Sequence, residues 1–163
     1  VWTFAGTFAS GGAIAGYDAT YISDYLTDMK NAGQKPAHWS FHDYNDVANQ
    51  DTGFPELTKF QSRLSSNGFP TNSIWITESG LNNYPNSNIN VCDTSVQQGQ
   101  ARTWLSLLHA SKVQTLFWYD WDTSPSAVGG LYNAGNRNPP TYSCGGASPG
   151  AVMQDYATLD VTG

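Results

Sequence analysis

The sequence has 163 residues, of which 39% are hydrophobic and 12% charged, and this composition suits one compact domain with a core rather than a disordered or fibrous chain. Thirteen acidic residues outnumber seven Lys and Arg, which are scattered along the chain. Nucleic acid and membrane are therefore not expected as partners, because phosphate binding needs concentrated positive charge and no apolar run approaches about 18 residues.

Hydrophobic periodicity predicts strands that alternate with helices. The strands are expected at residues 1–8, 37–44, 73–78 and 113–121, and the helices at 18–31, 54–66, 95–110 and 151–159. Gly33 and Gly68 follow the first two helices, where glycine is typical of a helix end. The Gly-, Pro- and Asn-rich stretch 123–150 is too long for an ordinary connection and is expected to be a functional loop.

The spacing of these strands indicates the fold class. They recur about every 36 to 40 residues, each followed by a helix, which is typical of βαβ units with parallel strands. We therefore expect an α/β fold in a single domain over residues 1–163. A doubly wound open sheet and an eight-stranded barrel share this rhythm, and the spacing does not choose between them.

Aromatic residues are abundant, with 6 Trp and 9 Tyr, whereas charges are few. This balance is common in extracellular carbohydrate-active proteins, because sugar rings stack on aromatic planes, and we expect a secreted protein. Cys92 and Cys144 lie in polar, loop-like segments, where a disulfide is the favoured interpretation and two separate thiols are the alternative. Neither cysteine has the neighbours of a zinc site, and no metal or cofactor is expected.

The third expected strand ends in a carboxylate. Strict alternation along this strand would place Glu78 on the same face as Ile74 and Ile76. An unpaired buried carboxylate is costly, so one at the carboxyl end of a parallel strand indicates the mouth of a site, where ligands bind in both candidate folds. The alternative is a glutamate that simply leaves the strand and faces solvent.

Two other expected strands end in polar and aromatic residues at the same edge. His42 and Tyr44 share one face of the second strand and can donate hydrogen bonds to a neighbouring carboxylate, although a lone histidine on a strand is often structural. The fourth strand ends with Trp118, Asp120 and Trp121, and alternation would put the Trp118 indole on the inner face. The alternative places either tryptophan in the core.

Three motifs in order carry a family resemblance: SFHDY at residues 40–44, WITESG at 75–80 and FWY at 117–119. They resemble the sixth, seventh and eighth strands of the large clan of retaining TIM-barrel glycoside hydrolases, which includes cellulases, mannanases, xylanases and xylosidases. The resemblance covers most of the chain up to about residue 122. It implies that the chain corresponds to the carboxyl-terminal half of such a barrel, strands five to eight.

The resemblance implies roles for the residues at this edge. Glu78 would be the nucleophile, His42 and Tyr44 would orient it or touch the substrate, and Trp118 would stack on the sugar. Asp120 and Trp121 would join the substrate-binding residues. Retaining chemistry also needs a second carboxyl group about 5 to 5.5 Å from the nucleophile.

That second carboxyl group is missing from the pattern. In the clan the acid/base is a glutamate that follows an asparagine, and this sequence contains no Asn-Glu pair. Glu56 is the other glutamate, and its position after Pro55 is explained by the favourable interaction of a carboxylate with a helix amino terminus.

A half-barrel of four strands would have two open edges, which are a liability. We therefore expect two copies, or one copy and a complementary half, to complete the barrel. The first hypothesis is a retaining glycoside hydrolase that cleaves β-linked polysaccharide or oligosaccharide, with an isolated half that can be inactive. The alternative is a non-catalytic carbohydrate-binding or scaffold half-barrel. A doubly wound enzyme of other chemistry has no Gly-x-Gly-x-x-Gly, P-loop or Gly-x-Ser-x-Gly motif to support it.

Overall fold

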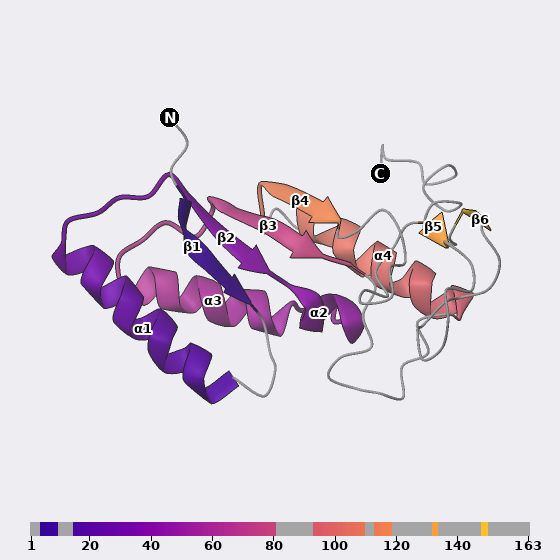
Figure 1. Ribbon diagram of the computed structural model, residues 1–163, viewed down its shortest axis with the longest axis horizontal. Coiled ribbons are helices and arrows are strands. Elements are labelled where there is room, and N and C mark those ends of the chain that lie inside the picture. Colours follow the sequence, from indigo (N-terminus) through magenta and orange to yellow (C-terminus); the bar gives the residue numbers. More distant parts are fainter. Residues whose placement is uncertain are drawn as a thin grey trace.

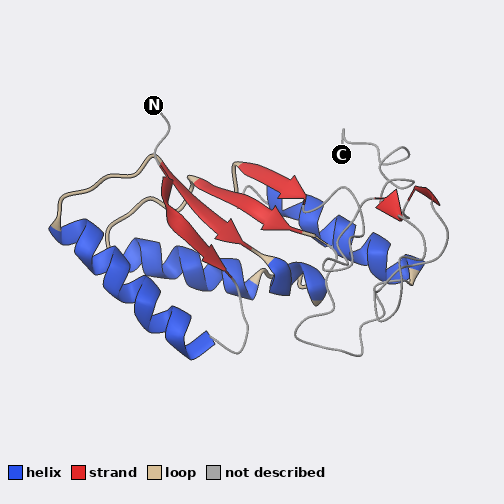
Figure 2. Cartoon of the chain, viewed as in Figure 1, coloured by secondary structure: helices blue, strands red, loops and turns tan. Residues whose placement is uncertain are grey.

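The fold is a parallel sheet with helices along one face (Figures 1 and 2). The computed structural model describes residues 4–9, 15–80, 93–109, 113–118, 132–133 and 148–149. Within them, the main sheet has the strand order β1-β2-β3-β4, and every neighbouring pair is parallel. Its strands are β1 (Phe4–Ala9), β2 (His38–His42), β3 (Ile74–Ser79) and β4 (Thr115–Trp118). The predicted α/β class with parallel strands is therefore confirmed.

One described helix follows β1, two follow β2 and one follows β3. They are α1 (Ala15–Asn31), α2 (Tyr44–Ala48), α3 (Pro55–Ser66) and α4 (Thr94–His109). Two short strands, β5 (Tyr132–Asn133) and β6 (Ser148–Pro149), pair antiparallel within the predicted loop 123–150. The predicted helix 151–159 and the predicted end of the fourth strand, residues 119–121, lie outside the described residues.

Glycine ends two of the helices as the sequence predicts. Gly33 and Gly68 adopt left-handed φ values of 66° and 80°, which cost little for a residue without a Cβ. After α3, the Phe69 amide donates to the Leu64 carbonyl at 2.9 Å. After α1, the Gln34 amide donates to the Met29 carbonyl, also at 2.9 Å and with the same spacing of five residues. These Schellman-type ends satisfy carbonyls that the helix leaves unpaired and turn the chain into β2 and β3.

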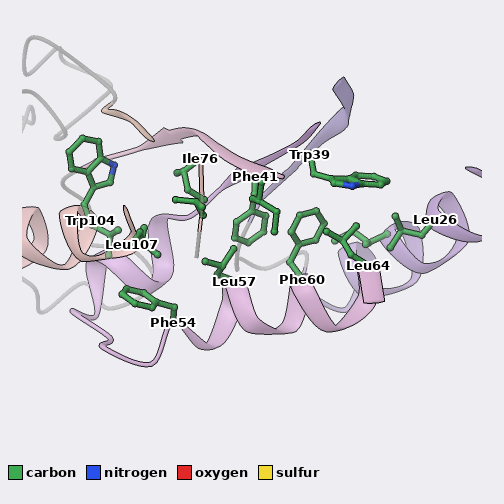
Figure 3. Packing of buried hydrophobic residues seen from close by; sticks show 14 residues of the cluster. Leu26, Trp39, Phe41, Phe54, Leu57, Phe60, Leu64, Ile76, Trp104 and Leu107 are labelled. Carbon is green, nitrogen blue, oxygen red and sulfur yellow. The ribbon is translucent and has the colours of Figure 1, made fainter. Parts of the chain in front are cut away.

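The core lies between the sheet and helices α1, α3 and α4 (Figure 3). Phe41 of β2 stacks on Phe60 of α3 with ring centroids 4.9 Å apart and planes 7° apart. Leu57 and Leu64 occupy the same face of α3 at helical spacing, and all of these side chains are almost fully buried. Burial of a large apolar side chain contributes roughly 1.5–3 kcal/mol, so this layer fixes the positions of β2 and β3.

One prediction about β3 is wrong. Ile74 and Ile76 are completely buried in the core, but Glu78 does not share their face. The pairing with β2 shifts register, since Phe41 lies opposite Ile76 and the next residue, His42, lies opposite Glu78. Thr77 is therefore an extra residue, and a bulge of this kind reverses the alternation of the side chains that follow it.

A second correction concerns the end of β2. The predicted strand 37–44 ends at His42, and Tyr44 is the first residue of the short helix α2. Asp43 starts this helix because its side chain accepts a hydrogen bond from the Asp46 amide. Tyr44 thus reaches the edge of the sheet from a helix rather than by strand alternation.

Candidate active site

Two adjacent strands bring Glu78 and His42 together. Glu78 is the second-last residue of β3, His42 is the last residue of β2, and the two are paired in register. Both lie at the carboxyl ends of parallel strands, which is the edge where α/β folds place their ligand sites. We call the sheet face opposite the described helices the open face, and both side chains belong to it.

The two oxygens of the Glu78 carboxylate face different groups. The Tyr44 hydroxyl donates to Oε1 at 2.6 Å, and Nδ1 of His42 lies 3.6 Å from Oε2. The Glu78 side chain is 34% exposed and that of His42 25%, so the cluster is held by protein groups and still reaches solvent. The structure therefore brings together three of the residues that the sequence singles out.

The electrostatics of the cluster favour a neutral imidazole. Burial lowers the pKa of His42, and the negative charge of Glu78 opposes this effect only in part. A neutral imidazole beside Glu78 can donate one hydrogen bond without adding a full positive charge.

The backbone behind the cluster is tied down from both strands. The Asp43 amide donates to the Glu78 carbonyl at 3.3 Å, and the Ser79 hydroxyl donates to the Asp43 carbonyl at 2.7 Å. On the open face, Ser40 and Thr77 share a side-chain hydrogen bond next to the bulge. These contacts hold the ends of β2 and β3 in one geometry, as a preorganised site requires.

Two buried carboxyl groups that the sequence pattern does not single out, Asp43 and Asp46, lie behind the site. Burial is the largest cause that raises the pKa of both Asp43 and Asp46, and their mutual proximity raises that of Asp43 further. A usable signal in the sequence is the spacing Asp-x-x-Asp directly after a strand, which is a common start for a helix.

Trp118 is a further predicted site residue within the described part of the chain. Trp118 packs against the core and against Trp104 of α4, with ring centroids 5.2 Å apart and an edge-to-face angle of 88°. This packing supports the alternative interpretation of Trp118 as a core side chain, and its stacking on a sugar stays a prediction. The remaining predicted residues lie outside the described part of the chain: Asp120, Trp121, Cys92 and Cys144.

The described residues contain no cluster of three or more His, Cys, Asp or Glu that could hold a metal ion. Within the same residues, none of the helices combines the length and the apolar character that crossing a membrane requires.

Comparison with known proteins gives one informative likeness. Neither the family models nor the curated proteins match the chain. Among solved structures it is similar to a mutant of a GH128 (subgroup I) endo-β-1,3-glucanase from Amycolatopsis mediterranei in complex with laminaripentaose, with a TM-score of 0.56 and 18% identity. The alignment covers 94% of this chain and 56% of the glucanase, so the chain spans about half of the glucanase's length. The likeness shows a fold shared with a glycoside hydrolase.

Proposed function

We propose that this chain is part of a retaining glycoside hydrolase in which Glu78 is the nucleophile. The observation that carries the proposal is the Glu78 carboxylate at the end of β3, partly exposed and held by the Tyr44 hydroxyl at 2.6 Å. A carboxylate with one oxygen fixed by a donor presents its other oxygen in a defined direction, as nucleophilic attack requires. The fold shared with an endo-β-1,3-glucanase supports the same reaction class.

The proposed reaction has two steps. In the first, a Glu78 oxygen forms a bond to the anomeric carbon, the glycosidic C–O bond breaks, and a carboxylic acid gives its proton to the leaving oxygen. In the second, the resulting carboxylate takes a proton from water, the water oxygen attacks the anomeric carbon, and Glu78 leaves. Tyr44 keeps its hydrogen bond to Glu78 before attack and after release.

The acid in the first step is proposed to come from outside the described residues. Glu56 does not fit this role, because its carboxylate pairs with Lys59 at 2.6 Å at the start of α3. Asp43 and Asp46 do not fit either, because both are fully buried behind the strand ends. We propose that β1 and β4 pair with further strands to close a barrel, supplied by a second copy or a complementary half, and that this part carries the acid.

The proposed substrate is a β-linked glucan. The related glucanase structure contains laminaripentaose, so β-1,3-glucan oligosaccharides are the first compounds to test. An aromatic face and a partly exposed carboxylate suit a neutral sugar chain better than an acidic one, since the protein carries a net charge of −6.

The test separates the nucleophile from the missing acid. A 2,4-dinitrophenyl β-laminaribioside has a leaving group that departs without protonation, so its cleavage needs Glu78 but no acid. We expect Glu78→Gln to lower the rate at least ~1000-fold. Glu56→Gln is the matched control, because it makes the same chemical change at the other glutamate, and it should keep the wild-type rate.

Two results would overturn the proposal. Equal rates for wild type and Glu78→Gln would remove Glu78 from the mechanism. Binding of laminaripentaose without cleavage of the activated substrate would instead support a non-catalytic carbohydrate-binding protein.

A further inference from the structure

Asp43 connects the candidate nucleophile to the helices behind it. Its amide donates to the Glu78 carbonyl at 3.3 Å, and its carbonyl accepts the Ser79 hydroxyl at 2.7 Å. The next residue is Tyr44, whose hydroxyl bonds to the Glu78 carboxylate. The position of the Tyr44 ring therefore depends on how Asp43 starts α2.

Asp46 fixes α2 against α3. Its two carboxylate oxygens accept the amides of Glu56 and Leu57, at 3.0 and 3.1 Å, in the first turn of α3. The residue at the cap position of α3, Phe54, has a left-handed φ of 47° and makes no side-chain cap. Asp46 thus supplies the missing cap from the neighbouring helix, and an ionised carboxylate is the form that accepts two amides at a helix amino terminus.

The Asp43 carboxyl group is in a different position. Its side chain is completely buried, its Oδ1 accepts a long 3.4 Å bond from the Asp46 amide, and a hydrogen bond with the Asp46 side chain contributes to the raised pKa of Asp43. Its Oδ2 has no hydrogen-bond partner among the described residues. An ionised carboxylate with a buried, unpartnered oxygen beside a second carboxylate is strongly disfavoured, whereas the protonated acid is not.

Among the residues that the structure describes, the electrostatic influences on Asp43 include no positive charge that would stabilise its ionised form. Asp46 of α2 and Glu56 of α3 are acidic, and Lys59 is engaged by Glu56 at 2.6 Å. His42 of β2 has a lowered pKa because of its own burial, and the Glu78 carboxylate faces it. Burial, and then the charge of Asp46, raise the pKa of Asp43 well above its usual range.

We propose that Asp43 is a neutral carboxylic acid that, together with ionised Asp46, positions Tyr44 against Glu78. Asp43 and Asp46 are positioning residues, since neither reaches the open face. The inference deepens the proposed function, because Tyr44 matters to catalysis only if Glu78 is the nucleophile. Its test, however, measures proton uptake and the surroundings of Tyr44 and needs no activity.

The first experiment compares unfolding of wild type and Asp43→Asn by denaturant from about pH 5 to pH 9. An amide has the shape of the protonated acid but does not titrate. Because the folded-state pKa of Asp43 lies above the unfolded-state pKa, the folded protein holds one extra proton at pH values between these two pKa values. As the pH rises through this range, the unfolding constant of wild type should therefore increase relative to that of Asp43→Asn, by up to tenfold per pH unit. Asp28→Asn, an exposed control on α1, should run parallel to wild type.

The second experiment follows the Tyr44 ring by NMR in protein labelled with ¹³C at the tyrosine Cζ atoms. Loss of one signal in Tyr44→Phe assigns the resonance. At neutral pH this signal should stay in place in Asp43→Asn and move toward the position of an exposed tyrosine in Asp43→Ala. If Asp43→Ala does not fold, the comparison of wild type with Asp43→Asn still decides the question.

Two results would overturn the proposal. One is a pH dependence of unfolding that is the same in wild type and Asp43→Asn. The other is a Tyr44 signal in Asp43→Asn that is shifted at neutral pH, since that would mean the charge of Asp43 is needed. Inactivity of every variant toward glucans would count against the proposed function and leave both measurements valid.

Discussion

The open face has two ends with different chemistry. At the carboxyl end, the Tyr44 hydroxyl donates to Glu78, and His42 lies beside the same carboxylate. At the amino end, the Gln114 oxygen accepts from the Trp75 indole at 3.2 Å and bonds Nδ1 of His38 at 3.1 Å. Because an indole N–H only donates, that oxygen is the acceptor, and His38 carries a proton on Nδ1.

The difference between the two ends begins at one residue. Before Thr77, the open face of β3 bears Trp75, which also lies near the half-exposed Phe117 ring. After Thr77, the face bears a carboxylate. The amino end of the open face thus carries neutral aromatic side chains, and its carboxyl end carries a charged carboxylate. The bulge at Thr77 decides which face of the sheet Glu78 occupies. The following predictions test that division, from the largest expected effect to the smallest.

Insertion of one alanine between Phe41 and His42 should have the largest effect. The inserted residue would lie opposite Thr77 and remove the bulge, so strict alternation would turn Glu78 into the buried row of Ile74 and Ile76, where a carboxylate is costly. We expect a loss of activity of at least ~1000-fold together with a lower melting temperature. Thr77→Ser keeps the bulge and a hydroxyl for Ser40, so it is the control. An active insertion variant would show that the bulge does not position Glu78.

Tyr44→Phe should have an intermediate effect on activity. The substitution keeps the ring and removes the hydroxyl that donates to the Glu78 carboxylate. A hydrogen bond to a charged group contributes about 1.5–3 kcal/mol, which corresponds to a fall in kcat of roughly 10- to 100-fold. Steady-state kinetics on the activated laminaribioside measure it, and an unchanged kcat would mean that Tyr44 does not orient the nucleophile.

Gln114→Leu should affect stability and leave the chemistry unchanged. The change removes the oxygen that Trp75 and His38 share at the amino end. We expect a loss of about 1–2 kcal/mol in the free energy of unfolding, measured with denaturant. The kcat of this variant should equal that of wild type. A large fall in kcat would contradict the separation of the two ends.

The pH dependence contributed by His42 should be the smallest effect. Since burial lowers the folded-state pKa, the unfolded protein binds more protons, and stability is lost as pH falls below the ordinary histidine value of 6.5. The unfolding constant of wild type should therefore rise relative to His42→Asn as the pH falls, by less than tenfold per unit because Glu78 opposes the shift. The reverse trend would mean that the negative charge of Glu78 raises the pKa of His42 by more than burial lowers it.

Much of the fold follows from the sequence because its signals are local. Gly33 and Gly68 mark helix ends that depend on one left-handed residue each, and the apolar spacing of α3 sets its buried face. The meeting of His42 and Glu78 follows from parallel strands whose carboxyl ends share an edge.

The parts that sequence reasoning missed depend on contacts between distant segments. The bulge at Thr77 exists only in the pairing of β3 with β2, so strict alternation gives the wrong face for Glu78. Asp46 bonds to amides ten and eleven residues away in α3, and such a cap is invisible to a search of adjacent residues. Trp118 could be assigned to a face only once its packing on Trp104 was known.

Covalent trapping of Glu78 tests the central claim most directly. A 2-deoxy-2-fluoro-β-laminaribiosyl fluoride slows both steps of a retaining mechanism but keeps a good leaving group, so the glycosyl-enzyme accumulates. Mass spectrometry of the intact protein and its peptides should find one added disaccharide, bound to Glu78 in wild type and in Glu56→Gln and missing from Glu78→Gln. An adduct on another residue, or none in wild type, would contradict the assignment of Glu78 as the nucleophile.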